Sequence, residues 1–259
     1  MRNIGRLAAA YVLPPLFLFA VIIAFWEFYI WWKDVSIIVV PPPHRVAETF
    51  WEERSLLWEE GGWTLYEAML GLIFGSVTAI ALAAVMAHSR VLERAIFPLA
   101  IMVKVTPMVA VAPVFVIVLG FGTTPKVVVA ALLSFFPMLV NAMTGFRDVN
   151  DRSLEFLHSI KASTWQVFYK LRVPSALPYL FSALRITFPL AIIGAVVAEW
   201  FTGTRGLGYV IYVASANLNT PRLFASIAVL AIIGVVINIL LSIIERRVLF
   251  WHESVRSTR

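Results

Sequence analysis

Six apolar runs, each long enough to cross a lipid bilayer, dominate this sequence and constrain what it can fold into. They lie near residues 11–32, 65–87, 96–119, 125–143, 178–200 and 223–245. A transmembrane helix needs about 20 predominantly apolar residues. Hydrophobic residues make up 61% of the 259 residues, which is more than one globular core can bury. We therefore expect an all-α transmembrane protein that forms a single membrane domain over residues 1–259.

A cleaved signal peptide is the alternative interpretation of the first run. A signal peptide has a short apolar region followed by a cleavage site of small residues. The first run has full spanning length, ends in the aromatic stretch "FWEFYIWW" and lacks such a site. We therefore interpret this run as a membrane anchor that stays in the protein.

The distribution of Lys and Arg among the loops predicts the orientation, because cytoplasmic loops carry an excess of these residues. One set of loops holds thirteen: Arg2, Arg6, Arg90, Arg94, Arg147, Arg152, Lys161, Lys170, Arg172, Arg246, Arg247, Arg256 and Arg259. The opposite set holds six: Lys33, Arg45, Arg54, Lys126, Arg205 and Arg222. Both termini are therefore expected in the cytoplasm. The net charge of +6 follows from this topology, and we expect no nucleic-acid partner.

The second run carries a ridge of small residues at four-residue spacing. The ridge consists of Gly71, Gly75, Ala79, Ala83 and Ala87. Small residues on one side of a helix let another helix approach closely in lipid. We therefore expect this side of the second span to pack against a neighbouring helix.

Two prolines and a lysine in the third run indicate a candidate pathway through the membrane. Pro107 and Pro113 each remove a backbone hydrogen bond, and the freed carbonyls need partners from protein or water. Broken helices often line translocation pathways, and a packing kink is the alternative for any single proline. Lys104 lies about 12 Å from the inner end of the run at 1.5 Å per residue. It is expected to face the bundle interior or to extend to the headgroups.

The motifs of nucleotide, metal and covalent chemistry are missing from the sequence. No GxxxxGK[ST] phosphate loop and no Gly-Lys pair occur. The stretch "GTRGLG" lacks the spacing of a dinucleotide fingerprint, and we interpret it as a tight external turn. The four histidines fall on separate loops and the chain has no cysteine. We therefore expect no catalytic residue, no metal and no cofactor on this chain.

A polar segment at residues 147–175 separates the fourth and fifth runs. It is too polar to enter lipid and too short to fold as a domain, so we interpret it as two short helices on the cytoplasmic side. Apolar side chains at helical spacing lie on both helices. They are Phe156, Leu157 and Ile160 in the first helix, and Trp165, Phe168 and Tyr169 in the second. Such a face is buried against the bundle or the headgroups, or against a soluble partner.

Capping residues indicate where these two helices begin and end. The first helix is predicted to start near Asp151 or Ser153. The second has Ser163 as its N-cap and Gln166 three residues later, which is the pattern of a capping box. Pro174 is expected to stop the second helix, because a proline disfavours helix in the residue before it.

The spacing of the segment points to a known motif. In order it contains Glu155-Phe156-Leu157, Lys161 after three residues, and Leu171-Arg172-Val173-Pro174 after nine more. This pattern resembles the EAA loop of permease subunits in binding-protein-dependent ABC importers. That loop reads Glu-Ala-Ala, three residues, Gly, nine residues, then Ile-x-Leu-Pro. The departures here are large residues at both alanine positions and Lys161 at the glycine position.

The resemblance extends over most of the chain, from about Pro41 to Arg247. Five ordered blocks carry it: "PPPHRV", "TLYEAMLGLIFGSV", "TPMVAVAPVFVIVLGFGTTPKVVVAALLSFFPMLVN", "PSALPYLFSALRI" and "AEWFTGTRGLGYVI". They resemble the branch of these permeases that serves sulfonates, nitrate, thiamine-precursor pyrimidines and riboflavin.

The resemblance implies a six-helix type I ABC importer permease in a bacterial inner membrane, with a cytoplasmic coupling helix seated on an ATPase subunit. The residues it assigns to ATPase coupling are Glu155, Phe156, Leu157, Ile160, Lys161, Trp165, Phe168 and Pro174. The implied partners are cytoplasmic ATPase subunits, an external substrate-binding protein and a second copy of the chain or a similar permease. ATP hydrolysis then belongs to a separate subunit, and this chain is not an enzyme.

The solute is expected to be a small organic molecule. We favour a vitamin-type heterocycle, riboflavin or a thiamine-precursor pyrimidine, because the spans carry aromatic side chains and a single candidate cation. A sulfonate or nitrate importer is the alternative within the family. A secondary transporter is the alternative from another class, and it would require several paired charges at mid-membrane, for which only Lys104 is a candidate. A purely structural scaffold would not need the capped helix pair.

Overall fold

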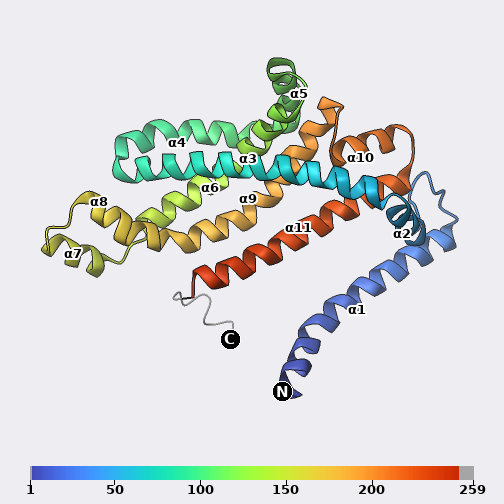
Figure 1. The fold of residues 1–259 in the computed structure, drawn as a ribbon, viewed down its shortest axis with the longest axis horizontal. Helices are drawn as coiled ribbons and strands as arrows, with labels where there is room; N and C mark the ends of the chain where they lie inside the picture. Colours follow the sequence, from blue (N-terminus) through green and yellow to red (C-terminus); the bar gives the residue numbers. More distant parts are fainter. Residues whose placement is uncertain (1, 251–259) are drawn as a thin grey trace. The chain divides into compact units, whose positions relative to one another are not determined.

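The computed structural model describes residues 2–250, with side chains described from Leu13 onward, and these residues form helices joined by short turns (Figure 1). In chain order the helices are α1 (Arg2–Lys33), α2 (Pro43–Glu52), α3 (Arg54–His88), α4 (Arg90–Val105), α5 (Met108–Leu119), α6 (Thr123–Arg147), α7 (Asp151–Ser159), α8 (Thr164–Val167), the π-helix η1 (Phe168–Arg172), α9 (Val173–Thr202), α10 (Leu207–Ala216) and α11 (Thr220–Val248). No strand occurs in the described part of the chain, which agrees with the expected all-α class.

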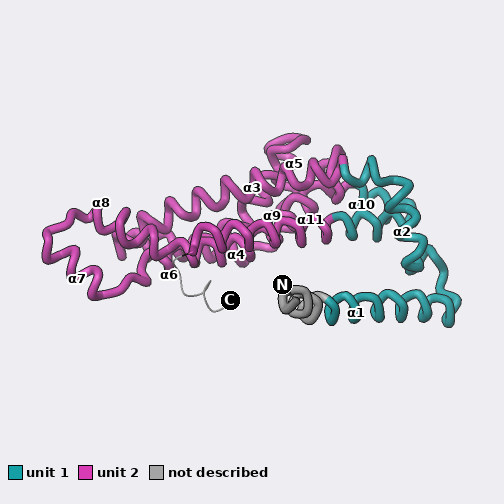
Figure 2. The backbone as a smooth tube through the Cα atoms, turned by 60° about the horizontal axis from the view of Figure 1, so that its bottom comes forward, with its two compact units in different colours: residues 1–58, 210–229 teal, residues 59–209, 230–259 magenta. Residues whose placement is uncertain are grey.

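Contacts divide the chain into two compact units (Figure 2). Unit 1 comprises residues 1–58 and 210–229, and unit 2 comprises residues 59–209 and 230–259. Helices α3, α10 and α11 each contribute residues to both units. The single membrane domain stays a prediction, and the two units are described separately below.

Five helical segments are long and apolar enough to cross a membrane. They are Leu13–Lys33, Arg54–His88, Thr123–Arg147, Thr164–Thr202 and Thr220–Val248. The predicted third span falls on two helices, α4 and α5, which are bent by 98° at the break between them. Counted as one span, this bent pair makes six. Pro107 is the N-cap of α5, so the break falls at a proline, as the lost backbone donor requires.

Helix α6 forms the centre of unit 2, where it packs most extensively against α9. Helix α6 also contacts α3, through the small residues of the α3 ridge. A Cβ atom added to Gly75 would lie 2.5 Å from the backbone carbonyl oxygen of Ala131 on α6, which is too close for any side chain. Ala79 and Ala83 of the same ridge are fully buried. The predicted role of the small-residue ridge in close helix packing is thereby confirmed.

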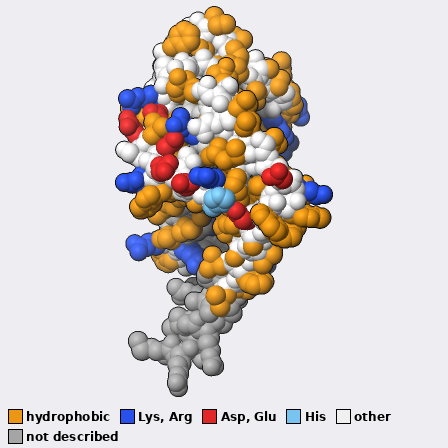
Figure 3. Space-filling view, turned by 90° about the vertical axis from the view of Figure 1, so that its right-hand side faces the viewer, with side chains coloured by type: hydrophobic (Ala, Val, Ile, Leu, Met, Phe, Trp, Pro, Cys, Tyr) orange, Lys and Arg blue, Asp and Glu red, His pale blue; other side chains and the backbone are white. Residues whose placement is uncertain are grey.

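Paired side chains hold the elements of unit 1 together. Arg222 of α11 donates to both carboxylate oxygens of Glu53 at 2.6 Å, which is a bidentate ion pair. Nδ1 of His44 lies 2.6 Å from a carboxylate oxygen of Glu27 on α1. Figure 3 shows charged side chains gathered over the middle of one face, with hydrophobic side chains above and below them.

Apolar side chains along α1 are largely exposed in unit 1. Phe17, Phe25 and Trp31 are examples, and only 6% of the most apolar window of α1 is buried. Exposed apolar side chains along a spanning helix are suited to contact with lipid tails. Of the cations that predict the orientation, the side chains of Arg2, Arg6, Arg256 and Arg259 lie outside the described residues. The orientation of the termini stays a prediction.

Candidate coupling surface and outer charge cluster

Hydrogen bonds to the backbone fix the start of both helices in the polar segment. Helix α7 begins at Asp151 as predicted, and the side-chain oxygen of Asn150 accepts from the N–H of Ser153 at 3.2 Å. The predicted capping box of α8 is confirmed. The N–H of Gln166 donates to Oγ of Ser163 at 3.3 Å, and the N–H of Ser163 donates to Oε1 of Gln166 at 2.8 Å.

The turn between α7 and α8 is a Schellman motif centred on Lys161. The N–H of Ala162 donates to the carbonyl of Leu157, and the N–H of Lys161 donates to the carbonyl of His158, both at 2.9 Å. Lys161 has φ +55°, a left-handed conformation that favours glycine. The chain therefore makes the turn that the motif glycine would make, although a lysine occupies the position. The left-handed backbone costs about 1–2 kcal/mol for a residue with a Cβ atom.

The prediction that Pro174 stops the second helix is wrong. Helix α8 continues through η1 into α9, and the whole segment Thr164–Thr202 is one apolar helical stretch. In η1 the N–H of Val173 bonds to the carbonyl of Phe168, five residues back. This wider turn, together with a place at the start of α9, lets Pro174 enter the helix where its missing donor is tolerated. The polar segment is thus joined to a membrane span without a break.

Large apolar side chains in and next to α7 and α8 are exposed on the surface of unit 2. Phe156 is 63% exposed, Ile160 58% and Trp165 73%. We call these three side chains the coupling face. Glu155 beside them is exposed, and Leu157 is half-buried. Within the described chain the coupling face is therefore mostly exposed and available to a partner.

Phe168, which was assigned to the same face, lies in the core of unit 2 instead. Its ring centroid lies 5.3 Å from that of Phe146 on α6, 5.0 Å from that of His88 at the end of α3 and 5.8 Å from that of Trp165. It belongs to the main apolar cluster of the unit. Phe168 therefore anchors the segment that carries the coupling face.

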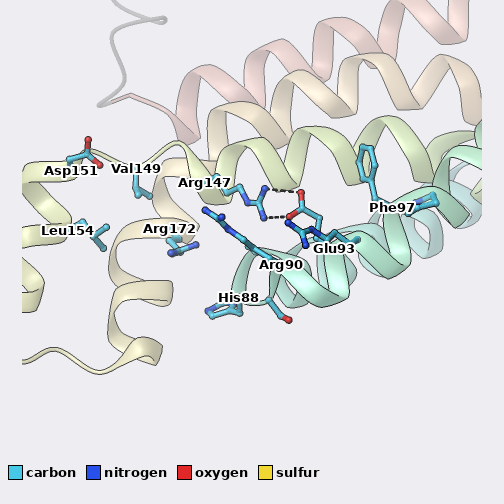
Figure 4. A pocket seen from close by; sticks show the side chains of 13 residues that line it. His88, Arg90, Glu93, Phe97, Arg147, Val149, Asp151, Leu154 and Arg172 are labelled. Carbon is cyan, nitrogen blue, oxygen red and sulfur yellow. Dashed lines mark hydrogen bonds and ion pairs between the residues drawn. The ribbon is translucent and has the colours of Figure 1, made fainter.

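A cavity of about 920 Å³ lies beside this anchor, at the ends of α3, α4 and α6 nearest to α7 (Figure 4). Four arginines line it: Arg90, Arg94, Arg147 and Arg172. Arg147 donates to both carboxylate oxygens of Glu93, at 2.9 and 2.6 Å. The guanidinium of Arg172 donates to the carbonyl of Phe146 at 3.3 Å. The lining therefore carries more positive than negative charge.

The three predicted pathway residues lie at or near the break between α4 and α5. Lys104 is in the last turn of α4, is exposed, and its Nζ lies 4.9 Å from the ring centroid of Phe136. Pro107 caps α5, and Pro113 lies inside that helix and is half-buried. Lys104 and Pro107 therefore lie on either side of the 98° bend.

At the opposite end of α9, three charged side chains are buried together. We call Glu67 of α3, Lys126 of α6 and Glu199 of α9 the outer charge cluster; their exposed fractions are 1%, 1% and 0%. Nζ of Lys126 donates to Oε1 of Glu67 at 2.8 Å and to the carbonyl of Arg205 at 2.9 Å. The carboxyl group of Glu199 lies against Gly206, the residue after Arg205. The cluster thereby joins three helices of unit 2.

The turn that follows α9 is fixed to the same helices. The N–H of Gly206 donates to Oε2 of Glu60 at 2.6 Å, and the N–H of Leu207 donates to the hydroxyl of Thr64 at 2.8 Å. Gly206 has φ +107°, and a Cβ atom there would overlap the carboxyl group of Glu199. The stretch "GTRGLG" is therefore a tight turn, as predicted, and its glycine lets the backbone cover a buried carboxyl group.

The outer charge cluster was not predicted from the sequence. Lys126 had been placed among the loop cations, and Lys104 was the single candidate for a mid-membrane charge that could couple ions. The available signal was the presence of Glu67 and Lys126 just inside the ends of two predicted spans. Among the described residues no group of three His, Cys, Asp or Glu is placed to hold a metal.

Comparison with known families settles what kind of protein this is. Residues 71–250 match the family described as "Binding-protein-dependent transport system inner membrane component". The chain belongs to this family. It is a multi-pass permease subunit of an ABC importer for a small solute, and the family consists of transporter subunits rather than enzymes.

Curated relatives of the permease differ in the solutes that their names state. It is 34% identical to the riboflavin transport system permease protein RibX of Chloroflexus aurantiacus, over 90% of this chain and 88% of the relative. It is 32% identical to the formylaminopyrimidine transport permease protein ThiX of Halalkalibacterium halodurans, over 93% and 96%. It is 31% identical to a putative aliphatic sulfonates transport permease protein, SsuC of Bacillus subtilis, over 91% and 86%.

Solved structures support the fold of the permease. A chain of the MetNI methionine ABC transporter in inward-facing conformations matches with a TM-score of 0.66 and 19% identity, over 78% of this chain and 98% of that one. A chain of an amino acid ABC transporter matches with a TM-score of 0.61 and 16% identity, over 77% and 97%. The predicted fold class, that of a type I ABC importer permease, is confirmed.

Proposed function

We propose that this chain forms the membrane pathway of an ATP-driven importer and is coupled to a cytoplasmic ATPase through the coupling face. One observation carries the proposal: two short capped helices present exposed apolar side chains, and the second of them, α8, continues through η1 into the membrane span α9. An exposed apolar patch on a rigid element is typical of a protein interface. An ATPase groove would bury it.

Each part of the segment has a role in this proposal. Phe156, Ile160 and Trp165 contact the ATPase, while Leu157 supports them from its half-buried position. Glu155 and Lys161 orient the turn between the two helices. Phe168 anchors the segment in unit 2, and Pro174 belongs to the continuous connection to α9. Closure of two ATPase subunits would then move α7, α8 and α9 as one body and change access to the pathway.

The bend between α4 and α5 supports a pathway next to Lys104, Pro107 and Pro113. Backbone groups freed at a broken helix are tolerated in lipid only where they meet protein or a water-filled cavity. Lys104 is exposed at this bend. A second copy of the chain, or a similar permease, would cover this side and complete the pathway. The external partner is a substrate-binding protein, and both termini face the cytoplasm in this arrangement.

For the solute we propose a vitamin-type heterocycle, either riboflavin or a thiamine-precursor pyrimidine. The relatives named for riboflavin and formylaminopyrimidine transport are 34% and 32% identical to this chain over about nine-tenths of its length. A planar heterocycle also suits spans that are rich in aromatic side chains.

A sulfonate is the second candidate, and a specific observation favours it. The cavity at the cytoplasmic end of unit 2 is lined by four arginines, and guanidinium groups bind anions such as sulfonates. The relative named for aliphatic sulfonates is 31% identical. Calorimetry on the importer's own substrate-binding protein with riboflavin, an aminopyrimidine and taurine separates the two candidates, because only the transported class should bind tightly.

The coupling proposal is tested with the double variant Phe156→Asp, Ile160→Asp. Two buried carboxylates in an apolar groove should abolish association with the ATPase, while the variant stays in the membrane fraction. Pull-down of the ATPase and ATP-dependent uptake in reconstituted vesicles are the measurements. The matched control is Leu218→Asp, an exposed apolar residue that lies outside the coupling segment. Normal recovery of the ATPase by the double variant would refute the coupling face.

A further inference from the structure

The outer charge cluster contains one positive charge for two carboxyl groups. Lys126 is the only cation among its buried members, and it is 2.8 Å from Glu67. Arg205 contributes only its backbone carbonyl to the cluster, because its guanidinium pairs with Glu59 at 2.9 Å in an exposed position. If both carboxyl groups were ionised, the cluster would hold a net negative charge with almost no access to water.

Burial makes this uncompensated charge costly. An ionised carboxylate without a full set of partners is strongly disfavoured in a medium of low dielectric. Glu199 is 0% exposed and Glu67 is 1% exposed, so water cannot screen them. Two carboxylates that share such a site cannot both stay ionised without a large cost.

Two oxygen atoms in the cluster lack hydrogen-bond partners. Oε2 of Glu67 and Oε1 of Glu199 are buried, and neither accepts a hydrogen bond from the described residues. The other oxygen of each group is satisfied: Lys126 donates to Oε1 of Glu67, and the N–H of Gly208 donates to Oε2 of Glu199 at 2.5 Å. Both unsatisfied atoms belong to one buried cluster: the carboxyl group of Glu199 lies against Gly206, and the carbonyl of the neighbouring Arg205 accepts from the same Lys126 that pairs with Glu67. One hydrogen between them would satisfy both.

We propose that Glu67 and Glu199 form a buried binding site for one proton, completed by the ammonium group of Lys126. The proton supplies the O–H that joins the two carboxyl groups and reduces the net charge of the cluster to zero. This site lies on unit 2 alone and does not depend on which solute is transported. It joins α3 to α9 at the end where the Gly206 turn closes over Glu199.

The ionisable groups that surround the site are few. On α3 they are Glu59, which pairs with Arg205, and Glu60, which accepts from the N–H of Gly206. On α6 the group is Lys126 itself, and on α10, where Gly208 donates to Glu199, it is Tyr209; α5, which packs against α6 and α9, contains no ionisable residue. A rise in pH that removes the proton would therefore leave two facing carboxylates and a single ammonium, and the contact between α3 and α9 would weaken.

Infrared difference spectroscopy tests the site directly. The purified chain in lipid nanodiscs at neutral pH should show the carbonyl band of a neutral carboxylic acid, which is separate from carboxylate bands. Glu199→Gln and Glu67→Gln should each abolish this band, because either change leaves one carboxylate with one ammonium. Glu59→Gln, on the exposed part of α3, is the matched control and should retain it. Two variants are used so that a folding defect in one leaves the test intact.

The wild-type chain should show a defined dependence of this band on pH and none on Na⁺. The band should fade as pH is raised, and replacement of Na⁺ by a large organic cation should leave it unchanged. Absence of the band at neutral pH, or its persistence in both glutamine variants, would overturn the proposal. So would a thermal unfolding temperature that rises with Na⁺ together with no neutral carboxyl band, because the unsatisfied oxygens would then hold a metal ion.

Discussion

The two ends of α9 are stabilised in opposite ways, and the difference shows where the molecule needs a partner. At its C-terminal end, Glu199 is buried with Lys126 and Glu67, and the turn that follows is bonded to α3. At the other end, α9 continues into a segment whose coupling face is exposed. Polar groups are enclosed at one end and apolar groups are exposed at the other. The first end is complete within the chain, while the second requires another protein to cover it.

The largest effect should come from disrupting the C-terminal end of α9. Lys126→Met removes the only cation of the cluster and leaves the carboxyl groups buried without it. Breaking one partner of a buried ion pair costs about 3–5 kcal/mol of unfolding free energy. Urea unfolding of the chain in detergent micelles measures the loss. The control is Lys126→Met with Glu67→Met, which removes both charges and should recover most of the stability; if it is as unstable as the single variant, the charge argument is wrong.

At the other end, two phenylalanines should respond differently to the same substitution. Phe168→Ala removes a buried ring from the contacts with Phe146 and His88, and should cost about 3 kcal/mol of unfolding free energy. Phe156→Ala removes a ring that is 63% exposed, and should change stability by less than about 0.5 kcal/mol. Its effect should appear in ATPase affinity, with a loss of about tenfold or more.

Thermal unfolding and a binding titration on both variants separate the two roles. A stable Phe168→Ala would mean that this ring does not anchor the segment. Unchanged ATPase affinity of Phe156→Ala would exclude it from the interface.

A smaller and opposite effect is expected at the turn of the coupling segment. Lys161 has φ +55°, and Lys161→Gly relieves the left-handed strain, so stability should rise by about 1 kcal/mol. Ala162→Gly next to it, at a position without positive φ, is the control and should not stabilise. If Lys161→Gly also weakens ATPase binding, then the lysine side chain has a contact role besides its place in the turn.

Local patterns in the sequence were sufficient to predict where the two helices of the polar segment, residues 147–175, begin. The capping box of Ser163 and Gln166 spans three residues, and the start of α7 at Asp151 depends on its immediate neighbours. The prediction that Pro174 ends the helix failed because the π-helix η1 directly before it lets the proline enter the first turn of α9. The formation of η1 depends on how the segment is anchored in unit 2. The burial of Phe168 depends on contact with Phe146, which is distant in the sequence, so local patterns could not predict it.

The outer charge cluster could not be derived from local patterns. Lys126 and Glu67 are 59 positions apart, and each alone has the appearance of a charge at the end of a span. Their pairing follows from the close approach of α3 to α6, which the small residues at Gly71 and Gly75 allow. The ridge was predictable from its spacing, but the side chains that it would bring together were not. A search for opposite charges at equal depth on adjacent spans would have found the pair.

Site-specific cross-linking tests the central claim most directly. The chain has no cysteine, so Ile160→Cys places a unique thiol on the coupling face. The assembled importer should form a cross-link between this thiol and its ATPase, while Thr204→Cys, in the exposed outer turn, should form none. A complex that hydrolyses ATP but gives no product from Ile160→Cys would contradict the account. So would a product from Thr204→Cys.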